Sequence, residues 1–269
     1  MYNRKTFHNV TKALDMFKND ELMFDPGTKY NYTTHGYTLL SAVAEKVAGR
    51  PFTALLLELF ETLGMHETRL DENPPVVASR AQYYHRTKAH KLENVREVNC
   101  SCKWAGGGLL SSVNDLLVFG NAMLAAYQTA DVQDSNEKIM DQAIPKVPFL
   151  SASSVRQMWS AQVTYKVKSK HKGTVQKQYG LGWNVAPPKR DQKCFNNQPW
   201  AKDAFVAHSG GAIGASSVLV IRPEPGSWSG TGTGTETPPR GICVAILVNL
   251  EGVSCASLAE EIVTAFESA

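Results

Sequence analysis

Residues 208–221 read HSGGAIGASSVLVI, a polar, glycine-rich start that leads into a short apolar run. The run from Val218 to Ile221 and a second one from Ile242 to Val248 have the length of buried strands. Residues 226–239, which separate them, are rich in Gly, Thr and Ser, so we expect a mobile loop there. This part of the chain is therefore predicted to form neighbouring strands of one sheet.

A second informative stretch, FDPGTKYNYTT, occupies residues 24–34. Its Asp-Pro-Gly start predicts a turn, because Pro presets its own φ and Gly tolerates positive φ. Beyond it, apolar periodicity predicts a helix that ends at Gly49, a second helix over 51–63, a third after Asn114 and Asp115, and a final helix packed on the sheet. The apolar positions of the four helices are Tyr37, Leu40, Val43, Ala44 and Val47; Phe52, Leu55, Leu56, Leu59, Phe60 and Leu63; Leu116, Leu117, Phe119, Met123 and Leu124; and Leu258, Ile262 and Phe266. Residues 71–102 are polar and predict loops with short strands.

The composition limits the classes of function. The chain has 269 residues, of which 43% are hydrophobic, and can bury a core. Its net charge of +3 is too small to indicate a nucleic-acid partner or an anionic membrane. The longest apolar run falls far short of the ~20 residues of a transmembrane helix, so no transmembrane segment is predicted. The lysine-rich run Lys166–Lys172 is interpreted as a solvated loop.

Neither the cysteines nor the glycines at 106–108 indicate a binding site. Five cysteines form no disulfide framework, which favours reduced thiols. Cys100 and Cys102, with His85 and His90 upstream, have poor spacing for structural zinc, so we expect no metal and no cofactor. The glycines at 106–108 match no phosphate-binding loop, and close packing of the backbone against a neighbouring element is the better interpretation.

Two tripeptides carry the chemistry: Tyr32-Thr33-Thr34 and His208-Ser209-Gly210. They resemble the second and third signatures of the serine beta-lactamase and penicillin-binding-protein superfamily, in the variants Tyr-x-Asn and His-Thr-Gly. The chain is similar in particular to the animal mitochondrial members of that superfamily. The resemblance continues in the same order through Pro26-Gly27, Gly36-Tyr37, Leu63-Gly64-Met65, Ala105-Gly106-Gly107, Asp115, Tyr179-Gly180-Leu181-Gly182-Trp183 and Asn249.

This resemblance implies an α+β fold of the beta-lactamase/transpeptidase type. Residues 1–269 would form one partial domain. About 1–165 would be a mostly helical lobe with the tyrosine motif, and about 179–269 would hold the C-terminal antiparallel strands of the central sheet and the last helix. Mobile insertions are expected near 131–148, 166–178 and 226–239. The N-terminal strands and the nucleophile helix of the superfamily would be missing.

The resemblance also implies the site residues. Tyr32 and His208 would be catalytic, because a phenol and an imidazole can move the proton in acyl transfer. Thr34, in place of the family's asparagine, would bind substrate together with Ser209. Gly210 and Gly211 would let the substrate lie along the strand edge, with the Gly211 amide as an oxyanion donor.

The first signature, a serine followed three residues later by lysine, is absent from its expected place upstream of Tyr32. Residues 1–31 contain no serine, and the two Ser-x-x-Lys matches, Ser135 with Lys138 and Ser169 with Lys172, lie downstream. We therefore expect the chain as given to be inactive and its exposed apolar surface to favour oligomers.

Two functions stay open. One is that of the superfamily: a mitochondrial serine hydrolase or peptidase, linked to lipid metabolism, that acts on a peptide-like or acyl substrate through an acyl-enzyme. The other is a non-catalytic pseudoenzyme or a subunit that self-assembles into filaments.

Overall fold

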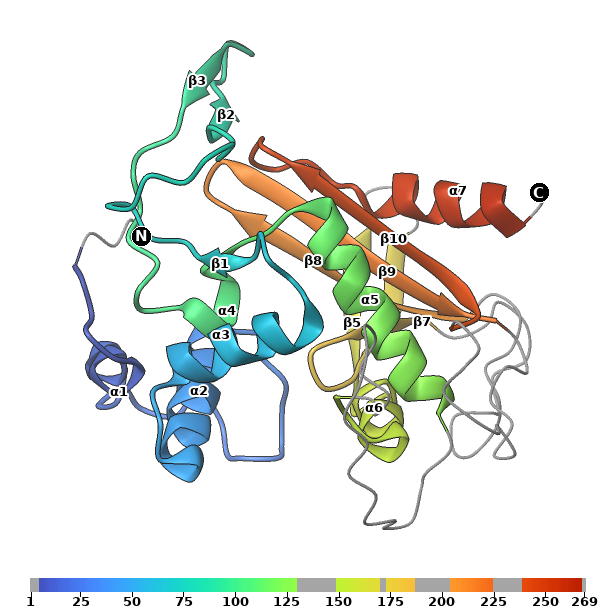
Figure 1. Ribbon diagram of the computed structural model, residues 1–269, viewed down its shortest axis with the longest axis horizontal. Coiled ribbons are helices and arrows are strands. Elements are labelled where there is room, and N and C mark those ends of the chain that lie inside the picture. The colour runs from blue at the N-terminus through green and yellow to red at the C-terminus, as the bar shows by residue number, and fades with distance from the viewer. Residues whose placement is uncertain (1–4, 130–148, 170–172, 187–203, 225–238, 268–269) are drawn as a thin grey trace. The chain divides into compact units, whose positions relative to one another are not determined.

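The computed structural model describes residues 5–129, 149–169, 173–186, 204–224 and 239–267 (Figure 1). Its elements are α1 (Val10–Ala13), the 3-10 helix η1 (Leu14–Met16), α2 (Thr34–Ala48), α3 (Phe52–Leu63), β1 (Arg69–Leu70), β2 (Tyr84–Arg86), β3 (Leu92–Asn94), α4 (Trp104–Gly107), β4 (Leu109–Leu110), α5 (Val113–Gln128), α6 (Ala152–Met158), β5 (Val163–Ser169), β6 (Gly173–Tyr179), β7 (Asn184–Ala186), β8 (Phe205–Ala212), β9 (Ala215–Pro223), β10 (Gly241–Val248) and α7 (Ala256–Glu267). No helix in these described ranges is long and apolar enough to cross a bilayer.

A six-stranded sheet organises the second half of the chain. Its strands follow the order β10-β9-β8-β7-β6-β5, and β5 to β8 pair with their neighbours in antiparallel register. Residues 213–214 alone separate β8 from β9, as in a hairpin. Helices and this antiparallel sheet together confirm the predicted α+β class.

Strand β9 is buried on both faces, which explains its uninterrupted apolar sequence. Leu219 and Ile221 belong to a core with the aromatic rings of Trp159 and Trp183. Arg222, on the alternate face, is 8% exposed and forms a 2.7 Å ion pair with Glu267 on α7. The apolar side chains from Val218 to Ile221 are therefore all buried.

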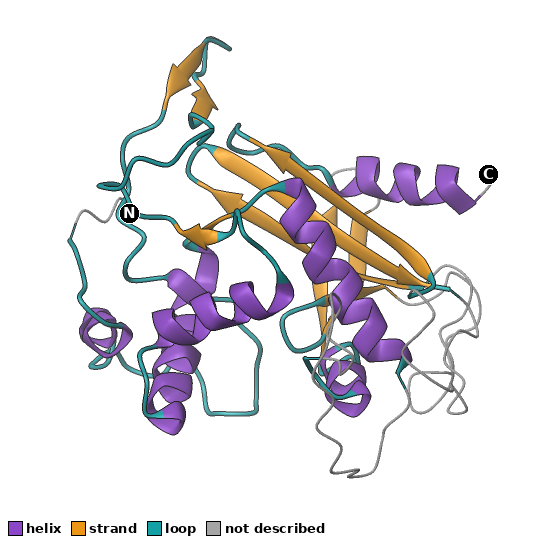
Figure 2. Cartoon of the chain, in the orientation of Figure 1, coloured by secondary structure: helices purple, strands orange, loops and turns teal. Residues whose placement is uncertain are grey.

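Helix α5 packs on the strands of that core (Figure 2). A Cβ atom at Gly120 would lie 3.3 Å from the Cys243 Sγ and 3.4 Å from the Leu219 Cδ1, so the helix approaches the sheet closely at this glycine. Met123 and Leu124, one turn further on, are each 1% exposed. The apolar periodicity of this helix thus predicted its buried face correctly.

Helices α2 and α3 end as the sequence predicted. Gly49 and Gly64 are their C-caps, with φ of 64° and 74°, a conformation that glycine adopts without strain. A smaller core of Val10, Cys100 and Trp104 packs with Phe52 and Leu56 of α3. By contrast, Leu40, Val43 and Val47 of α2 are 60%, 51% and 83% exposed, although their spacing predicted a buried stripe.

The chain divides into two compact units. The first consists of residues 1–115, 210–217 and 247–254, and the second of residues 116–209, 218–246 and 255–269. Most of α5, all of α6, strands β5, β6 and β7 and the larger parts of β8, β9 and β10 lie in the second unit. Within it, α5 and α6 bury apolar side chains in a core with residues of the strands.

One expectation about the loops needs correction. The region 166–178, expected as a loop, contributes to strands β5 and β6, which pair from Val163 with Tyr179 to Ser169 with Gly173. The alternation of Val163, Tyr165 and Val167 with polar residues is the pattern of a half-buried strand. The expected insertion at 131–148 lies outside the described residues, as does nearly all of 226–239.

The apolar stripe of the last helix is also shifted. Ala259 and Val263 are buried on α7, whereas Leu258 and Phe266 are 51% and 70% exposed. The buried residues lie four positions apart, one helical turn, and contain the smaller side chains. Small side chains let a helix approach a sheet closely. The prediction from the larger residues Leu258 and Phe266 therefore identified the wrong face.

Candidate active site

His208 forms a hydrogen bond with a tyrosine on another strand. The Tyr179 hydroxyl lies 3.1 Å from the His208 Nε2, and the planes of the two rings make an angle of 69°. Asn184 on β7 pairs both with Tyr179 on β6 and with Ala207 on β8. The hydrogen bond therefore joins β6 and β8, two strands that lie on either side of β7.

His208 is neutral near pH 7. Burial lowers the pKa of its imidazole, and a hydrogen bond with the backbone of Ser209 acts in the opposite direction. A backbone contact that favours the protonated ring is one in which a ring N–H donates to a carbonyl oxygen. Which group donates in the contact with Tyr179 depends on the tautomer of the ring: with the proton on Nδ1, Nε2 accepts from the Tyr179 hydroxyl.

Tyr32 precedes α2 and remains a protonated phenol near neutral pH. Its side chain is 49% exposed, and its ring centroid lies 6.4 Å from that of Tyr37. Burial, and secondarily Tyr37, raises the pKa of the Tyr32 hydroxyl. A protonated phenol can give a proton to a leaving group, which is the role expected from the sequence.

Thr34 opens α2, and its backbone is tightly enclosed. The Thr33 hydroxyl caps the helix by accepting from the His35 amide at 3.2 Å. A Cβ atom at Gly106 would lie 3.3 Å from both the Cβ and the carbonyl oxygen of Thr34. Gly106 thus allows the close packing that was predicted for this glycine run, whereas a Cβ atom at Gly107 would meet nothing within 4 Å.

The remaining candidate residues lie along β8. Ser209, Gly210 and Gly211 are exposed. A Cβ atom at Gly210 would collide with the Ser217 hydroxyl across the hairpin, whereas one at Gly211 would meet nothing within 4 Å. The backbone at Gly211 is therefore open to a ligand along one side of the strand.

The six candidate residues fall in both units. Tyr32, Thr34, Gly210 and Gly211 belong to the first, and His208 and Ser209 belong to the second. The structure adds Tyr179, a residue that sequence reasoning used only as part of a motif. Tyr179 opens the motif at 179–183, which connects β6 to β7, but nothing in that motif identifies His208 as its partner.

Other titratable groups have structural explanations. The cysteines in the described segments, Cys100, Cys102, Cys243 and Cys255, are free thiols. Asp115 is buried and accepts from the Glu67 amide at 2.8 Å and from the Thr68 hydroxyl at 2.7 Å. Within the described part of the chain, no cluster of three His, Cys, Asp or Glu side chains has the arrangement of a metal site.

Known proteins resemble this chain over nearly its whole length. The family model described as Beta-lactamase matches residues 2–263. The mitochondrial serine beta-lactamase-like proteins of Mus musculus and Homo sapiens are each 36% identical over 99% of this chain and 46% of their own length. The chain thus spans about half the length of these relatives.

Solved structures show the same fold at low identity. The octameric penicillin-binding protein homologue from Pyrococcus abyssi has a TM-score of 0.65 at 18% identity, covering 97% of this chain and 48% of that one. D-amino acid amidase from Ochrobactrum anthropi, complexed with L-phenylalanine, has a TM-score of 0.63 at 16% identity, covering 99% of this chain and 64% of that one.

Proposed function

Because the chain belongs to the beta-lactamase family, within the serine hydrolase superfamily, we propose that it is the substrate-binding and proton-transferring part of an acyl-transfer site. Tyr32 and His208 carry the proton chemistry, and Thr34, Ser209, Gly210 and Gly211 hold the substrate. The observation that supports this proposal most strongly is the partly buried hydrogen bond between Tyr179 and His208.

The hydrogen bond suits a histidine that must be neutral and fixed. A neutral imidazole accepts one proton and donates another, so it can pass a proton between a substrate and a neighbouring group. The tyrosine hydroxyl fixes the ring orientation, and burial of His208 keeps the ring uncharged. These properties match the role of the third family motif better than that of a surface histidine.

The nucleophile is the part that this sequence does not supply. Acyl transfer of the family type requires a hydroxyl activated by a neighbouring base. Residues 1–31 contain no serine, so none precedes Tyr32. The chain on its own is therefore proposed to bind an acyl substrate without forming an acyl-enzyme.

Substrate class and compartment follow from the relatives. The relatives from mouse and human are named mitochondrial, and one structural neighbour is a D-amino acid amidase. We extend both to this chain as a proposal: a mitochondrial protein that binds a peptide-like amide. A contribution to lipid metabolism would follow only if the bound acyl group were a lipid.

The proposal is tested by binding, because binding does not require the nucleophile. N-acetyl-D-phenylalanine amide is titrated into the protein while the NMR signals of Tyr32 and His208 are followed. Tyr32→Phe and His208→Gln should each weaken binding about tenfold, the effect of one lost hydrogen bond in a partly dry site. Tyr165→Phe, on β5, is the control. Equal affinity in all four proteins would contradict the proposal.

An assembly subunit is the second candidate, and α2 favours it. Leu40, Val43 and Val47 recur at positions i, i+3 and i+7 and are exposed, so one face of the helix presents an apolar stripe to solvent. Sedimentation of the protein with and without Val47→Lys separates the two functions. Assembly predicts oligomers that dissociate in the variant, whereas a monomer in both cases would exclude it.

A further inference from the structure

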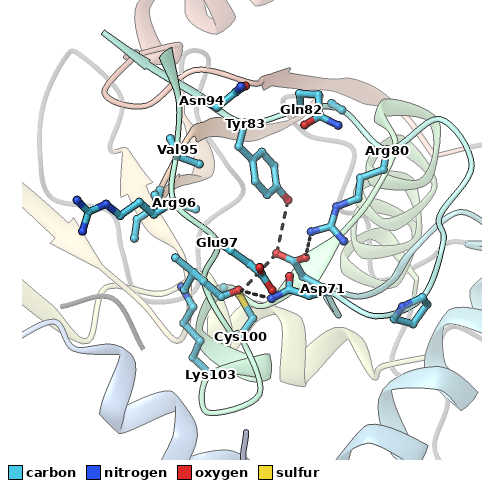
Figure 3. A pocket seen from close by; sticks show the side chains of 17 residues that line it. Asp71, Arg80, Gln82, Tyr83, Asn94, Val95, Arg96, Glu97, Cys100 and Lys103 are labelled. Atoms are coloured by element: carbon cyan, nitrogen blue, oxygen red, sulfur yellow. Dashed lines mark hydrogen bonds and ion pairs between the residues drawn. The ribbon is translucent and has the colours of Figure 1, made fainter. Parts of the chain in front are cut away.

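A cavity of about 410 Å³ lies within the first unit (Figure 3). None of Tyr32, Thr34, His208, Ser209, Gly210 or Gly211 lines it. Its walls come from the loop after β1, from the segment before β2, from the end of β3 and the segment that leads into α4, and from the β8–β9 hairpin. The volume falls in the range of small-molecule sites.

Asp71 is the centre of a satisfied network on the wall of this cavity. Its carboxylate forms a 2.6 Å ion pair with Arg80 and accepts from the Tyr83 hydroxyl and the Cys100 thiol, each at 3.5 Å. Burial is the main cause that raises the pKa values of Tyr83 and Cys100 to about 12, so both remain protonated donors. Asp71 and Arg80 therefore neutralise each other and leave no charge for a ligand.

Lys103 is a cation of the cavity lining that takes no part in this network, and with it the charged side chains of the lining (Asp71, Arg80, Arg96, Glu97 and Lys103) carry a formal charge of +1. Its side chain is half-buried and lines the cavity beside Cys100. Its ammonium acts to lower the pKa of the Cys100 thiol, although burial outweighs that effect. In the described segments, no carboxylate lies within ion-pair distance of Lys103.

The rest of the lining includes Arg96 and Glu97, whose formal charges sum to zero, and two neutral carboxamides. Figure 3 shows Gln82 and Asn94 on one side and Cys100 and Lys103 on the other, with the Tyr83 ring between them. Carboxamide side chains both donate and accept, so they match an amide group. A ligand that fits both walls has an anionic end and an amide end.

We propose that this cavity binds the carboxyl terminus of a short peptide or an N-acyl amino acid. The ligand's carboxylate pairs with Lys103, and its amide group meets Gln82 and Asn94. The Tyr83 ring packs against the chain between the two ends. Such a site is separate from the acyl-transfer residues and needs none of them.

The test uses N-acetylglycylglycine, which carries one carboxylate at neutral pH, and its neutral methylamide. Binding to the full chain is measured by NMR titration. We expect shifts at Tyr83, Asn94 and Lys103 with the acid, and at least tenfold weaker binding of the methylamide. Lys103→Gln should weaken the acid about tenfold, because a charge-assisted hydrogen bond is lost.

Three further variants make the result specific. Lys103→Arg keeps the charge and should retain binding, which also covers the case in which Lys103→Gln folds poorly. Lys91→Gln removes an exposed lysine at the β2–β3 turn, outside the cavity lining, and should change nothing. His208→Gln should leave this binding intact even if the acyl-transfer proposal fails. Equal binding of acid and methylamide, or an unchanged affinity in Lys103→Gln, would overturn the proposal.

Discussion

Replacing Tyr179 by phenylalanine should raise the pKa of His208. The hydroxyl of Tyr179 donates to Nε2 only while that nitrogen is unprotonated, so the 3.1 Å hydrogen bond stabilises the neutral imidazole. Phenylalanine preserves the packed ring and removes the donor. The ring stays buried, and the desolvation that lowers the pKa of His208 persists.

The expected rise in the pKa of His208 can be calculated from the free energy that one neutral hydrogen bond contributes. A partly buried bond contributes about 1 kcal/mol, and one pKa unit corresponds to 1.36 kcal/mol, so the pKa of His208 should rise by about 0.7. The measurement is an NMR titration of the His208 ring signals from pH 4 to pH 9 in the original protein and in the variant.

A matched control is available in the same sheet. The Tyr165 hydroxyl donates to the Asn184 Oδ1 at 3.2 Å, an amide oxygen rather than the imidazole. Tyr165→Phe should therefore leave the titration of His208 unchanged. A pKa in Tyr179→Phe that equals or falls below that of the original protein would refute the tautomer in which Nε2 accepts from the Tyr179 hydroxyl.

The other predictions concern stability. Because the pKa of His208 is lower in the folded state than in the unfolded state, the unfolded state binds more protons below pH ~6.5. Stability should therefore fall as the pH is lowered through that range, and His208→Gln should flatten the slope in urea unfolding measured at several pH values; a steeper slope would contradict it. Asp115→Ala should lower the free energy of unfolding by about 2–4 kcal/mol, because the Glu67 amide and the Thr68 hydroxyl lose a charged acceptor; a loss below about 0.5 kcal/mol would show that water replaces it. Gly180→Ala should cost more than about 2 kcal/mol, since a Cβ there would collide with the Met158 and Ser160 carbonyl oxygens, whereas Gly211→Ala should change stability by less than about 0.5 kcal/mol. Equal losses in the two glycine variants, measured by thermal unfolding, would contradict the packing at β6.

Local patterns predicted the elements better than their surroundings. The helical periodicity and the terminal glycines identified α2 and α3, and the apolar runs identified β9 and β10. The sequence did not reveal that α2 exposes Val47, or that α7 buries Ala259 and Val263 rather than Leu258. Which face of a helix is covered depends on the neighbouring elements, and a single periodic stripe contains no information about them.

The candidate site shows the same limit. His208 could be chosen from its tripeptide, but its partner Tyr179 depends on the register of β6, β7 and β8. Likewise, the Asp71 network joins residues up to 29 positions apart and has no motif of its own. Strand pairing and loop packing create both arrangements, so composition and spacing along the chain could not predict them.

The central claim is that this chain carries the substrate-binding side of an acyl-transfer site without its nucleophile. The most direct measurement is intact-mass spectrometry after incubation with a fluorophosphonate probe, under conditions in which N-acetyl-D-phenylalanine amide binds. The account predicts bound amide and no stoichiometric adduct. Complete labelling of a single serine would contradict it.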